Sequence, residues 1–177
     1  MRTSLLIAAM VSGAAMLVID PASMAAGARQ QLTLMRAGER PTITGPAANF
    51  TGKAVIDRQV RPDESKRIMG SMVSFEAGAR TAWHTHPLGQ TLIVTSGCGW
   101  VQTEGGELQE IRPGDVIWTP AGVRHWHGAQ AHSSMSHYAI VEPLNGQSAE
   151  WMEHVTDKQY TSGTSTRCQA PAARPAN

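Results

Sequence analysis

Between residues 53 and 141, short β-rich runs alternate with tight turns, and this spacing restricts the fold more than any other feature. The turns hold glycine and proline, as in R-P-G-D at 112–115 and P-A-G at 120–122. Runs of this length and spacing predict an antiparallel sandwich or barrel. Helical periodicity is absent apart from a single turn favoured at residues 155–160. The predicted strands lie at residues 54–60, 69–75, 91–95, 100–103, 108–111, 116–119 and 137–141.

The N-terminal residues predict export. Arg2 precedes an apolar run from Leu5 to Ile19, which suits the core of a signal peptide and is too short for a comfortable membrane span. We therefore assign residues 1–27 as a signal peptide and expect an exported protein, periplasmic or secreted. An uncleaved N-terminal anchor and a misassigned start codon are the alternatives.

The rest of the chain predicts one domain between two irregular segments. Residues 28–50 contain several glycines and prolines without periodicity and predict an N-terminal arm. Residues 51–160 form the predicted domain, with its core at about 67–143. The Ser/Thr/Pro/Ala composition of residues 161–177 predicts a disordered tail. A chain of 177 residues is long enough for one such domain with a sizeable core.

Charge and cysteine content bear on possible binding partners and on disulfide formation. The net charge is +1 and the sequence has no basic run, so nucleic acid is not an expected partner. No membrane span is expected in the mature chain. Cys98 lies in a glycine turn and Cys168 in the Pro/Ala tail. Export would permit their pairing, but nothing in the sequence sets their separation, and a disulfide is not favoured.

The histidine spacing carries the chemistry. His84 and His86 share a face if they lie on a strand, because residues two apart point the same way. Gln90 follows a Pro-Leu-Gly bend and can reach the same point, while His125 and His127 form a second pair. Imidazoles at such spacing suit Zn, Fe, Mn, Ni or Co. A polar loop and a catalytic histidine pair are alternatives to a metal site.

Two ordered motifs link these residues to a known family. G-x5-H-x-H-x3-Q-x6-G, from Gly78 to Gly97, resembles the first cupin motif, and G-x5-P-x-G-x2-H, from Gly114 to His125, resembles the second. The resemblance covers about residues 50–145. It implies an all-β cupin fold, the double-stranded β-helix or jelly-roll barrel. It also implies a homodimer, because cupins commonly pair through their sheets.

Departures from the wider family point to a subgroup. Gln90 stands where most cupins have Glu, and Ala129 stands where the second motif often has Asn. W-H-T-H-P-L-G-Q at 83–90, H-W-H-G at 125–128 and W-M-E-H at 151–154 are similar to small single-domain bacterial cupins. Some of these are manganese-dependent hydroxynitrile lyases that act on (R)-mandelonitrile. The resemblance implies one divalent metal, manganese before Fe, Zn, Ni or Co. The ligands that it implies are His84, His86, Gln90 and His125.

The neutral ligand set bears on the reaction. Three imidazoles and an amide leave a divalent ion its full charge, which makes it a stronger Lewis acid. This favours redox-neutral carbonyl chemistry over oxygen chemistry. In the lyases that the sequence resembles, a histidine on the last predicted strand is a candidate base for the substrate hydroxyl. His137 occupies that position here, and His127 is the alternative.

Four side chains are predicted to line the substrate pocket. Ser71 and Val73 point inward on their strand and are small enough to leave room for a compact ligand. Arg80 is either a salt-bridge residue or a contact to a substrate anion. Trp118 is either a substrate contact or, with Trp83 and Trp126, part of the barrel packing. The remaining histidines, His132 and His154, are predicted surface or loop residues.

The leading hypothesis is therefore a metal-dependent lyase for a small carbonyl-derived substrate, with cyanohydrin cleavage as its sharpest form. A metal-dependent dioxygenase is the first alternative and predicts iron and oxygen consumption. A non-enzymatic small-molecule-binding cupin is the second and predicts stabilisation by a ligand without turnover.

Overall fold

The computed structural model describes residues 32, 34–61, 67–163 and 168. By its internal contacts the chain divides into residues 1–34 and residues 35–177, and the features below belong to the second unit. The predicted signal peptide and most of the predicted tail lie outside the described residues. Within the described residues, no helix has the length and apolar character needed to cross a membrane.

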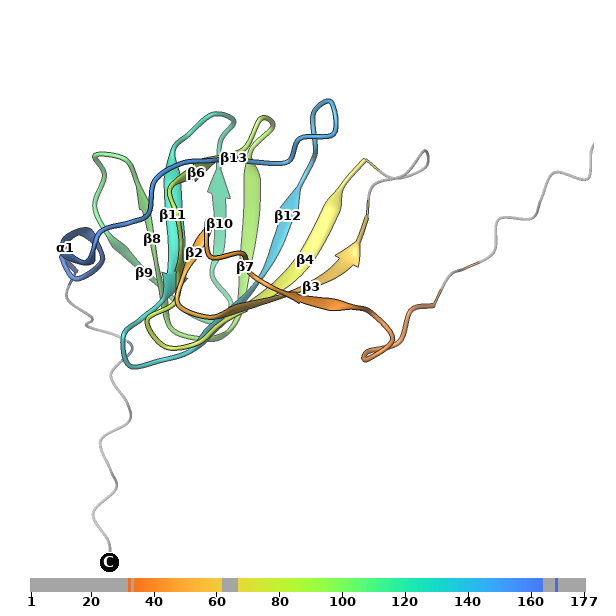
Figure 1. Ribbon diagram of the computed structural model, residues 1–177, viewed down its shortest axis with the longest axis horizontal. Helices are drawn as coiled ribbons and strands as arrows, with labels where there is room; N and C mark the ends of the chain where they lie inside the picture. The colour runs from red at the N-terminus through yellow and green to blue at the C-terminus, as the bar shows by residue number, and fades with distance from the viewer. Residues whose placement is uncertain (1–31, 33, 62–66, 164–167, 169–177) are drawn as a thin grey trace, which may run out of the picture. The chain divides into compact units, whose positions relative to one another are not determined.

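Two antiparallel sheets make up the described part of residues 35–177 (Figure 1). The six-stranded sheet has the order β1-β3-β4-β12-β7-β10. Its strands are β1 (Thr42–Thr44), β3 (Ala54–Val60), β4 (Met69–Phe75), β12 (Met135–Val141), β7 (Gln90–Gly97) and β10 (Val116–Thr119). The seven-stranded sheet has the order β13-β6-β11-β5-β2, and β8 pairs with β11 and β9. Its strands are β13 (Glu150–Trp151), β6 (His84–Thr85), β11 (His125–Ala129), β5 (Arg80–Thr81), β2 (Phe50–Thr51), β8 (Gly99–Thr103) and β9 (Gln109–Ile111).

The core lies between the two sheets because each turns one apolar face toward the other. Phe75 of β4 and Val94 of β7 come from the six-stranded sheet, and both are buried. Val101 of β8 and Ala129 of β11 belong to the same cluster and come from the other sheet. The strand positions predicted from the alternating pattern are confirmed, and so is the all-β class.

A second apolar cluster lies where α1 (Asp157–Tyr160) packs against the seven-stranded sheet. Trp83 and Trp126 are buried there against Tyr160, so their predicted packing role is confirmed. The short helix begins with a capping box, in which the Thr156 hydroxyl accepts from the Gln159 N–H at 3.2 Å. The helical turn predicted at residues 155–160 is therefore present.

Several short strands were not predicted. β1 lies within the segment predicted as an arm, and β11 was read only as a histidine pair. β11 lacks the usual alternation of apolar and polar residues, because it is buried along its whole length and its inward residues are His125 and His127. β6 covers only His84 and Thr85, and His86 follows it directly.

The sequence permitted a disulfide between Cys98 and Cys168 without favouring it, and the structure shows that the two are paired. They form a disulfide with a Cα–Cα distance of 5.9 Å. The chain returns to the β7–β8 turn because the Tyr160 hydroxyl donates to the Ala129 carbonyl at 2.8 Å, and the next residue, Gln130, donates from its N–H to the Cys98 carbonyl at 3.0 Å. This tertiary contact, which the sequence does not reveal, brings the two cysteines together.

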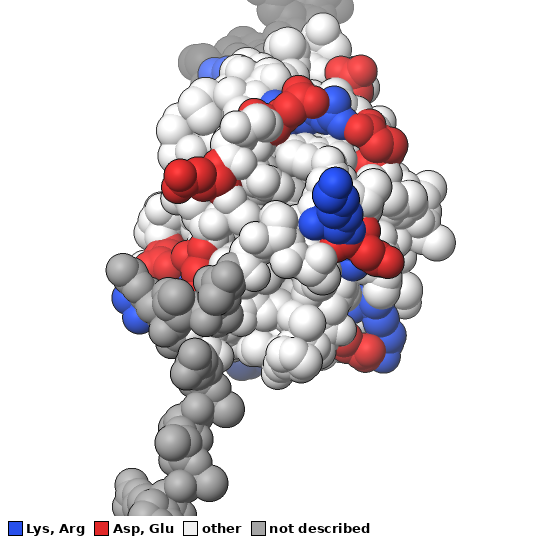
Figure 2. All heavy atoms as spheres, turned by 90° about the vertical axis from the view of Figure 1, so that its left-hand side faces the viewer, with Lys and Arg blue, Asp and Glu red and all other residues white. Residues whose placement is uncertain are grey.

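Charged side chains of both signs are interspersed on the face shown in Figure 2. Such mixing agrees with the near balance of 15 Lys and Arg against 14 Asp and Glu in the sequence. Oppositely charged residues also form ion pairs, including Arg124 with Glu104 and Glu153.

Candidate metal centre and substrate cavity

Strand register in the six-stranded sheet turns His137 and Gln90 toward the interior. Val73 of β4 pairs with His137 of β12, which pairs with Val94 of β7. Farther along β12, Val141 pairs with Gln90 at the start of β7. Residues an even number apart on a strand share a face, so His137 and Val141 point the same way. Gln90, opposite Val141, therefore faces the same interior space as His137.

The seven-stranded sheet supplies the other histidines. His84 of β6 pairs with His125 of β11, and Trp151 of β13 pairs with His84 from the other side. His127 shares the inner face of β11 with His125, and its N–H donates to the Thr81 hydroxyl at 3.1 Å. The two sheets thus bring histidines distant in sequence to one place.

Gly89 allows Gln90 to follow so closely after His86. Its φ is 82°, in the left-handed region that favours glycine. A side chain there would also meet the Thr119 carbonyl oxygen at 2.7 Å. The bend therefore requires glycine, and it returns the chain so that Gln90 enters β7 beside the histidines.

The five inward histidines form one cluster. The ring centroid of His84 lies 5.0 Å from that of His86, 4.3 Å from that of His125 and 5.3 Å from that of His127. Ligand atoms of His84, His125 and His127 lie within 4.8 Å of one another, so this group could hold a metal ion. His86 lies outside that three-residue group, with its ring centroid 5.5 Å from that of His125.

Backbone carbonyls fix the orientation of three of these rings. The Nδ1 of His84 donates to the Ala82 carbonyl at 3.0 Å, and the Nδ1 of His125 donates to the Val123 carbonyl at 3.0 Å. The Nδ1 of His86 donates to the Ser148 carbonyl at 2.6 Å. A carbonyl only accepts, so each Nδ1 carries the proton and each Nε2 of the neutral ring keeps its lone pair. Metal-binding histidines are usually oriented in this way.

Gln90 provides a test of whether a cation fits. Its Oε1 lies 3.0 Å from the Nε2 of His125. Both atoms are acceptors when His125 is neutral, so the contact lacks a proton between them. This separation matches two adjacent ligands at a right angle around one divalent ion with bonds of about 2.1 Å. The Nε2 of His86 is buried without a hydrogen-bond partner in the described residues. These donor atoms fit a divalent metal.

Burial keeps the clustered imidazoles neutral. It lowers the pKa of His86, and it lowers the pKa of His125 and of His137 to about 4. The pKa values of His84 and His127 are well below the ordinary range, because burial and then the neighbouring imidazoles disfavour the charged form. Neutral imidazole is the form that binds a metal or accepts a proton.

His127 and His137 form a separate pair. The Nε2 of His137 lies 3.0 Å from the Nδ1 of His127, so one of these nitrogens donates to the other. The outer nitrogens, Nε2 of His127 and Nδ1 of His137, are buried without a hydrogen-bond partner in the described residues. In the neutral pair, one outer nitrogen therefore keeps a lone pair that can accept a proton, and the other carries a proton.

The cluster opens into a cavity of about 220 Å³. His84, His86 and Gln90 line it together with the His127–His137 pair. The predicted pocket residues Ser71 and Val73 also line it. The volume is below that of most drug-sized ligand pockets, which indicates a small ligand. Its apolar wall includes Phe50, Ile56, Met69, Val73, Ala139 and Val141.

Comparison with known proteins places this arrangement in a family. A family model described as a cupin domain matches residues 71–141. A curated protein of Granulicella tundricola named (R)-mandelonitrile lyase is 54% identical over 129 residues, which cover 73% of this chain and 98% of that protein. The chain belongs to the cupin family. The predicted small cupin and its jelly-roll fold are thereby confirmed.

Solved structures agree with this fold. A cupin-like protein from Thermotoga maritima is 39% identical, with a TM-score of 0.62 over 66% of this chain and 89% of that one. A polyketide cyclase from Streptomyces resistomycificus is 13% identical, with a TM-score of 0.58 over 73% of this chain and 91% of that one. At this low identity, the second similarity concerns the fold alone.

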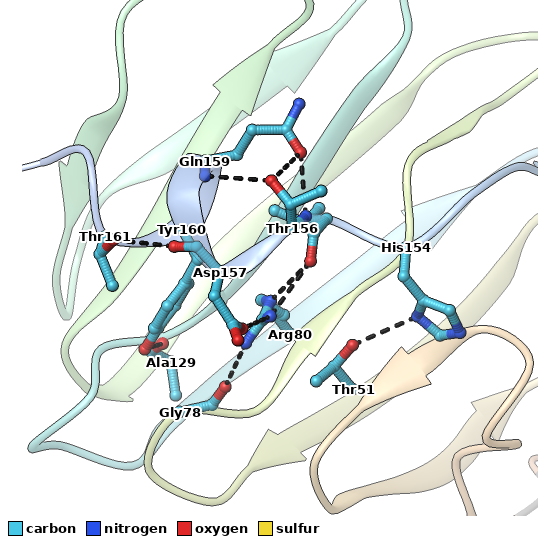
Figure 3. A network of polar contacts seen from close by, with 11 residues as sticks. Thr51, Gly78, Arg80, Ala129, His154, Thr156, Asp157, Gln159, Tyr160 and Thr161 are labelled. Carbon is cyan, nitrogen blue, oxygen red and sulfur yellow. Dashed lines mark hydrogen bonds and ion pairs between the residues drawn. The ribbon is translucent and has the colours of Figure 1, made fainter.

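In this cupin, Arg80 does not line the cavity, so its predicted pocket role is corrected and its alternative role in a salt bridge is confirmed. Its guanidinium donates to the Val155 carbonyl at 3.1 Å and to Asp157 at 2.7 Å (Figure 3). It also lies 4.5 Å from the ring centroid of Tyr160. The side chain is buried because β5 pairs with β11 and points Arg80 toward α1. Arg80 therefore holds the C-terminal segment against the seven-stranded sheet.

Trp118 is also outside the cavity, and both of its predicted roles are corrected. It is 60% exposed on β10, the last strand of the six-stranded sheet. It pairs with Thr91 on β7, whose neighbour Gln90 faces inward, so Trp118 faces outward. His132 and His154 are exposed, in agreement with their predicted place on the surface.

Sequence reasoning missed the groups that orient the ligands. The carbonyls of Ala82, Val123 and Ser148 hold the three imidazoles, and a carbonyl leaves no signal in the residue pattern. Arg58 was also missed as a cavity residue. Its position two residues after Ile56 on a predicted strand could have indicated a shared face.

Proposed function

We propose that this cupin is a metal-dependent lyase that cleaves or forms cyanohydrins such as (R)-mandelonitrile. The observation that carries the proposal is that two groups of histidines lie side by side. Three imidazoles have their Nδ1 atoms held by backbone carbonyls, and the His127–His137 pair lies beside them. The 54% identity to a protein named (R)-mandelonitrile lyase supports the choice of reaction.

We assign His84, His86, Gln90 and His125 as the residues that hold one divalent ion, with manganese as the first choice. When bound, such an ion supplies Lewis-acid chemistry, which makes a substrate hydroxyl more acidic. His127 could replace His86 in the ligand set by distance alone. We assign His127 to proton transfer instead, because its Nδ1 bonds to His137 and not to a carbonyl.

The His127–His137 pair is the proposed base. It takes the hydroxyl proton of the cyanohydrin as the hydroxyl oxygen becomes a carbonyl oxygen. The C–C bond breaks, and its electron pair leaves with cyanide. The pair then returns the proton to cyanide, which departs as hydrogen cyanide. A positioned histidine typically contributes about 100- to 10,000-fold in rate.

The apolar wall orients the rest of the substrate. Ile56 and Val73 pair across β3 and β4, and both line the cavity beside His137. An aromatic or aliphatic group packed on this wall would leave the hydroxyl facing the histidines. Burial of such a group contributes about 25 cal/mol per Å² of apolar surface.

One assay tests this proposal. The purified protein should contain near-stoichiometric divalent metal, and it should release cyanide from (R)-mandelonitrile when loaded with manganese. His86→Ala should lose metal and activity, whereas His154→Ala, at an exposed histidine, should keep both. Absence of cyanide release with manganese, iron or any other divalent ion would exclude the proposed lyase activity. Oxygen consumption with iron would favour the dioxygenase, and stabilisation by a ligand without turnover would favour a binding protein.

We also propose export and a homodimer. Export is supported by the Cys98–Cys168 disulfide, since such bonds persist in oxidising compartments. The dimer is supported by the exposed apolar residues on β10, where Val116 is 66% and Trp118 60% exposed. Light scattering of the protein and of Trp118→Ser tests the dimer, and a monomeric wild-type mass would exclude it.

A further inference from the structure

One formally charged side chain, Arg58, lines the cavity, and within the described residues no carboxylate does. Arg58 lies opposite Ser71 on β4, and Ile56 precedes it by two residues on β3. Both neighbours line the same cavity. Directly paired residues, and residues two apart on a strand, share a face. The register therefore places Arg58 on the cavity side of β3.

The nearest acid in sequence does not neutralise Arg58. Asp57 points to the opposite face of β3, where Arg40 binds it at 3.0 Å. Among the described residues, Arg58 has no hydrogen bond or ion pair, and its side chain is exposed. An arginine that is open to solvent and lines a cavity is available to a ligand.

The row of residues beside Arg58 leaves space for that ligand. Ser71 pairs with Arg58 on one side and with Ala139 of β12 on the other, and all three line the cavity. Ser71 and Ala139 are small, whereas the next rows of the sheet carry Val73 with His137 and Met69 with Val141. A ligand group can therefore lie along this row between Arg58 and the histidine cluster.

We propose that Arg58 binds a carboxylate on the natural substrate and so sets its specificity. The substrate class is a small carbonyl-derived compound with an apolar body, its reacting oxygen at the histidines and a carboxylate at the far end. A guanidinium suits this group because its fork of donors matches the two carboxylate oxygens. The reaction assigned to this substrate rests on the proposed function, but the carboxylate contact does not.

The test compares two matched probes by calorimetric titration, 4-formylbenzoate and benzaldehyde, which differ by the carboxylate. In Arg58→Gln, the affinity for 4-formylbenzoate relative to that for benzaldehyde should fall about fivefold, which is the size expected for loss of an exposed ion pair. Arg58→Lys should restore part of the ratio. Arg61→Gln removes the same charge outside the cavity lining and should leave the ratio at the wild-type value.

The selectivity of turnover gives the second readout. The ratio of kcat/KM for 4-carboxymandelonitrile to that for mandelonitrile should fall about fivefold in Arg58→Gln. An unchanged binding ratio, or an equal loss for both probes, overturns the proposal, because Arg58 would then act on a shared feature such as cyanide or the fold. If cyanide is never released but the binding ratio still depends on Arg58, the lyase fails and the carboxylate site stands.

Discussion

Breaking the Cys98–Cys168 disulfide should lower the free energy of unfolding by about 2 kcal/mol. The bond closes a loop of 70 residues in the unfolded chain. Chain-entropy theory assigns about 4 kcal/mol to a loop of this length. Reduction also gives the folded protein some conformational entropy, because Cys168 is then held only by the chain that follows Gly163, about five residues earlier. This gain offsets part of the stabilisation of about 4 kcal/mol. The difference, (3/2)RT ln(70/5), is about 2 kcal/mol.

Gly163 is the right reference point for that calculation. A side chain there would meet Leu108 at 2.5 Å and Trp100 at 3.3 Å, so the chain packs closely against the seven-stranded sheet up to this residue. The contacts of Tyr160 and Arg80 hold the same segment. The bond is therefore expected to stabilise the protein without being needed for α1 to dock.

Urea unfolding of Cys98→Ser and Cys168→Ser, each followed by tryptophan fluorescence, measures the effect. Both variants and the double variant should lose the same amount, with the melting temperature about 4–8 °C lower. Reductant should lower the stability of the wild type alone. A loss below about 0.5 kcal/mol, or additive losses in the double variant, would refute the loop argument.

Three further predictions concern the site and its surroundings. His137→Gln should keep its metal and lose about 100- to 10,000-fold in kcat, measured by metal analysis and cyanide release; full activity would contradict the assigned base. Arg80→Met should lower the free energy of unfolding by about 2 kcal/mol, because the bonds to Val155 and Asp157 are lost, and kcat/KM should not change. A fall in kcat/KM without a loss of stability would contradict this and indicate that Arg80 acts in the cavity. In metal-free protein, His137 has a pKa of about 4 when folded against an ordinary 6.5, so the unfolded chain binds more protons between these values. Stability from this group should be complete above pH 6.5 and fall by about 3 kcal/mol as the pH drops to about 4, and urea titrations showing the same loss in His137→Gln would contradict this.

The strands that carry an alternating apolar pattern could be predicted, but β6 and β11, which carry His84, His125 and His127, could not. β4 alternates between buried and more exposed residues, so its inward positions Ser71 and Val73 followed directly from the sequence. β11 has polar residues facing a buried interior, and β6 is two residues long, so neither shows a strand pattern. The site residues were found through motif spacing, because the spacing reflects the bends that return the chain.

The sequence by itself determined the repeated short strands, the glycine bends and the histidine and glutamine positions. These are local properties, since turn geometry and side-chain chemistry depend on near neighbours in the chain. Tertiary structure alone decided which carbonyls hold each imidazole and that His127 meets His137. It also paired Cys98 with Cys168, buried Arg80 beside α1 and turned Arg58 into the cavity. These contacts depend on strand register across two sheets, which residue patterns within one strand do not specify.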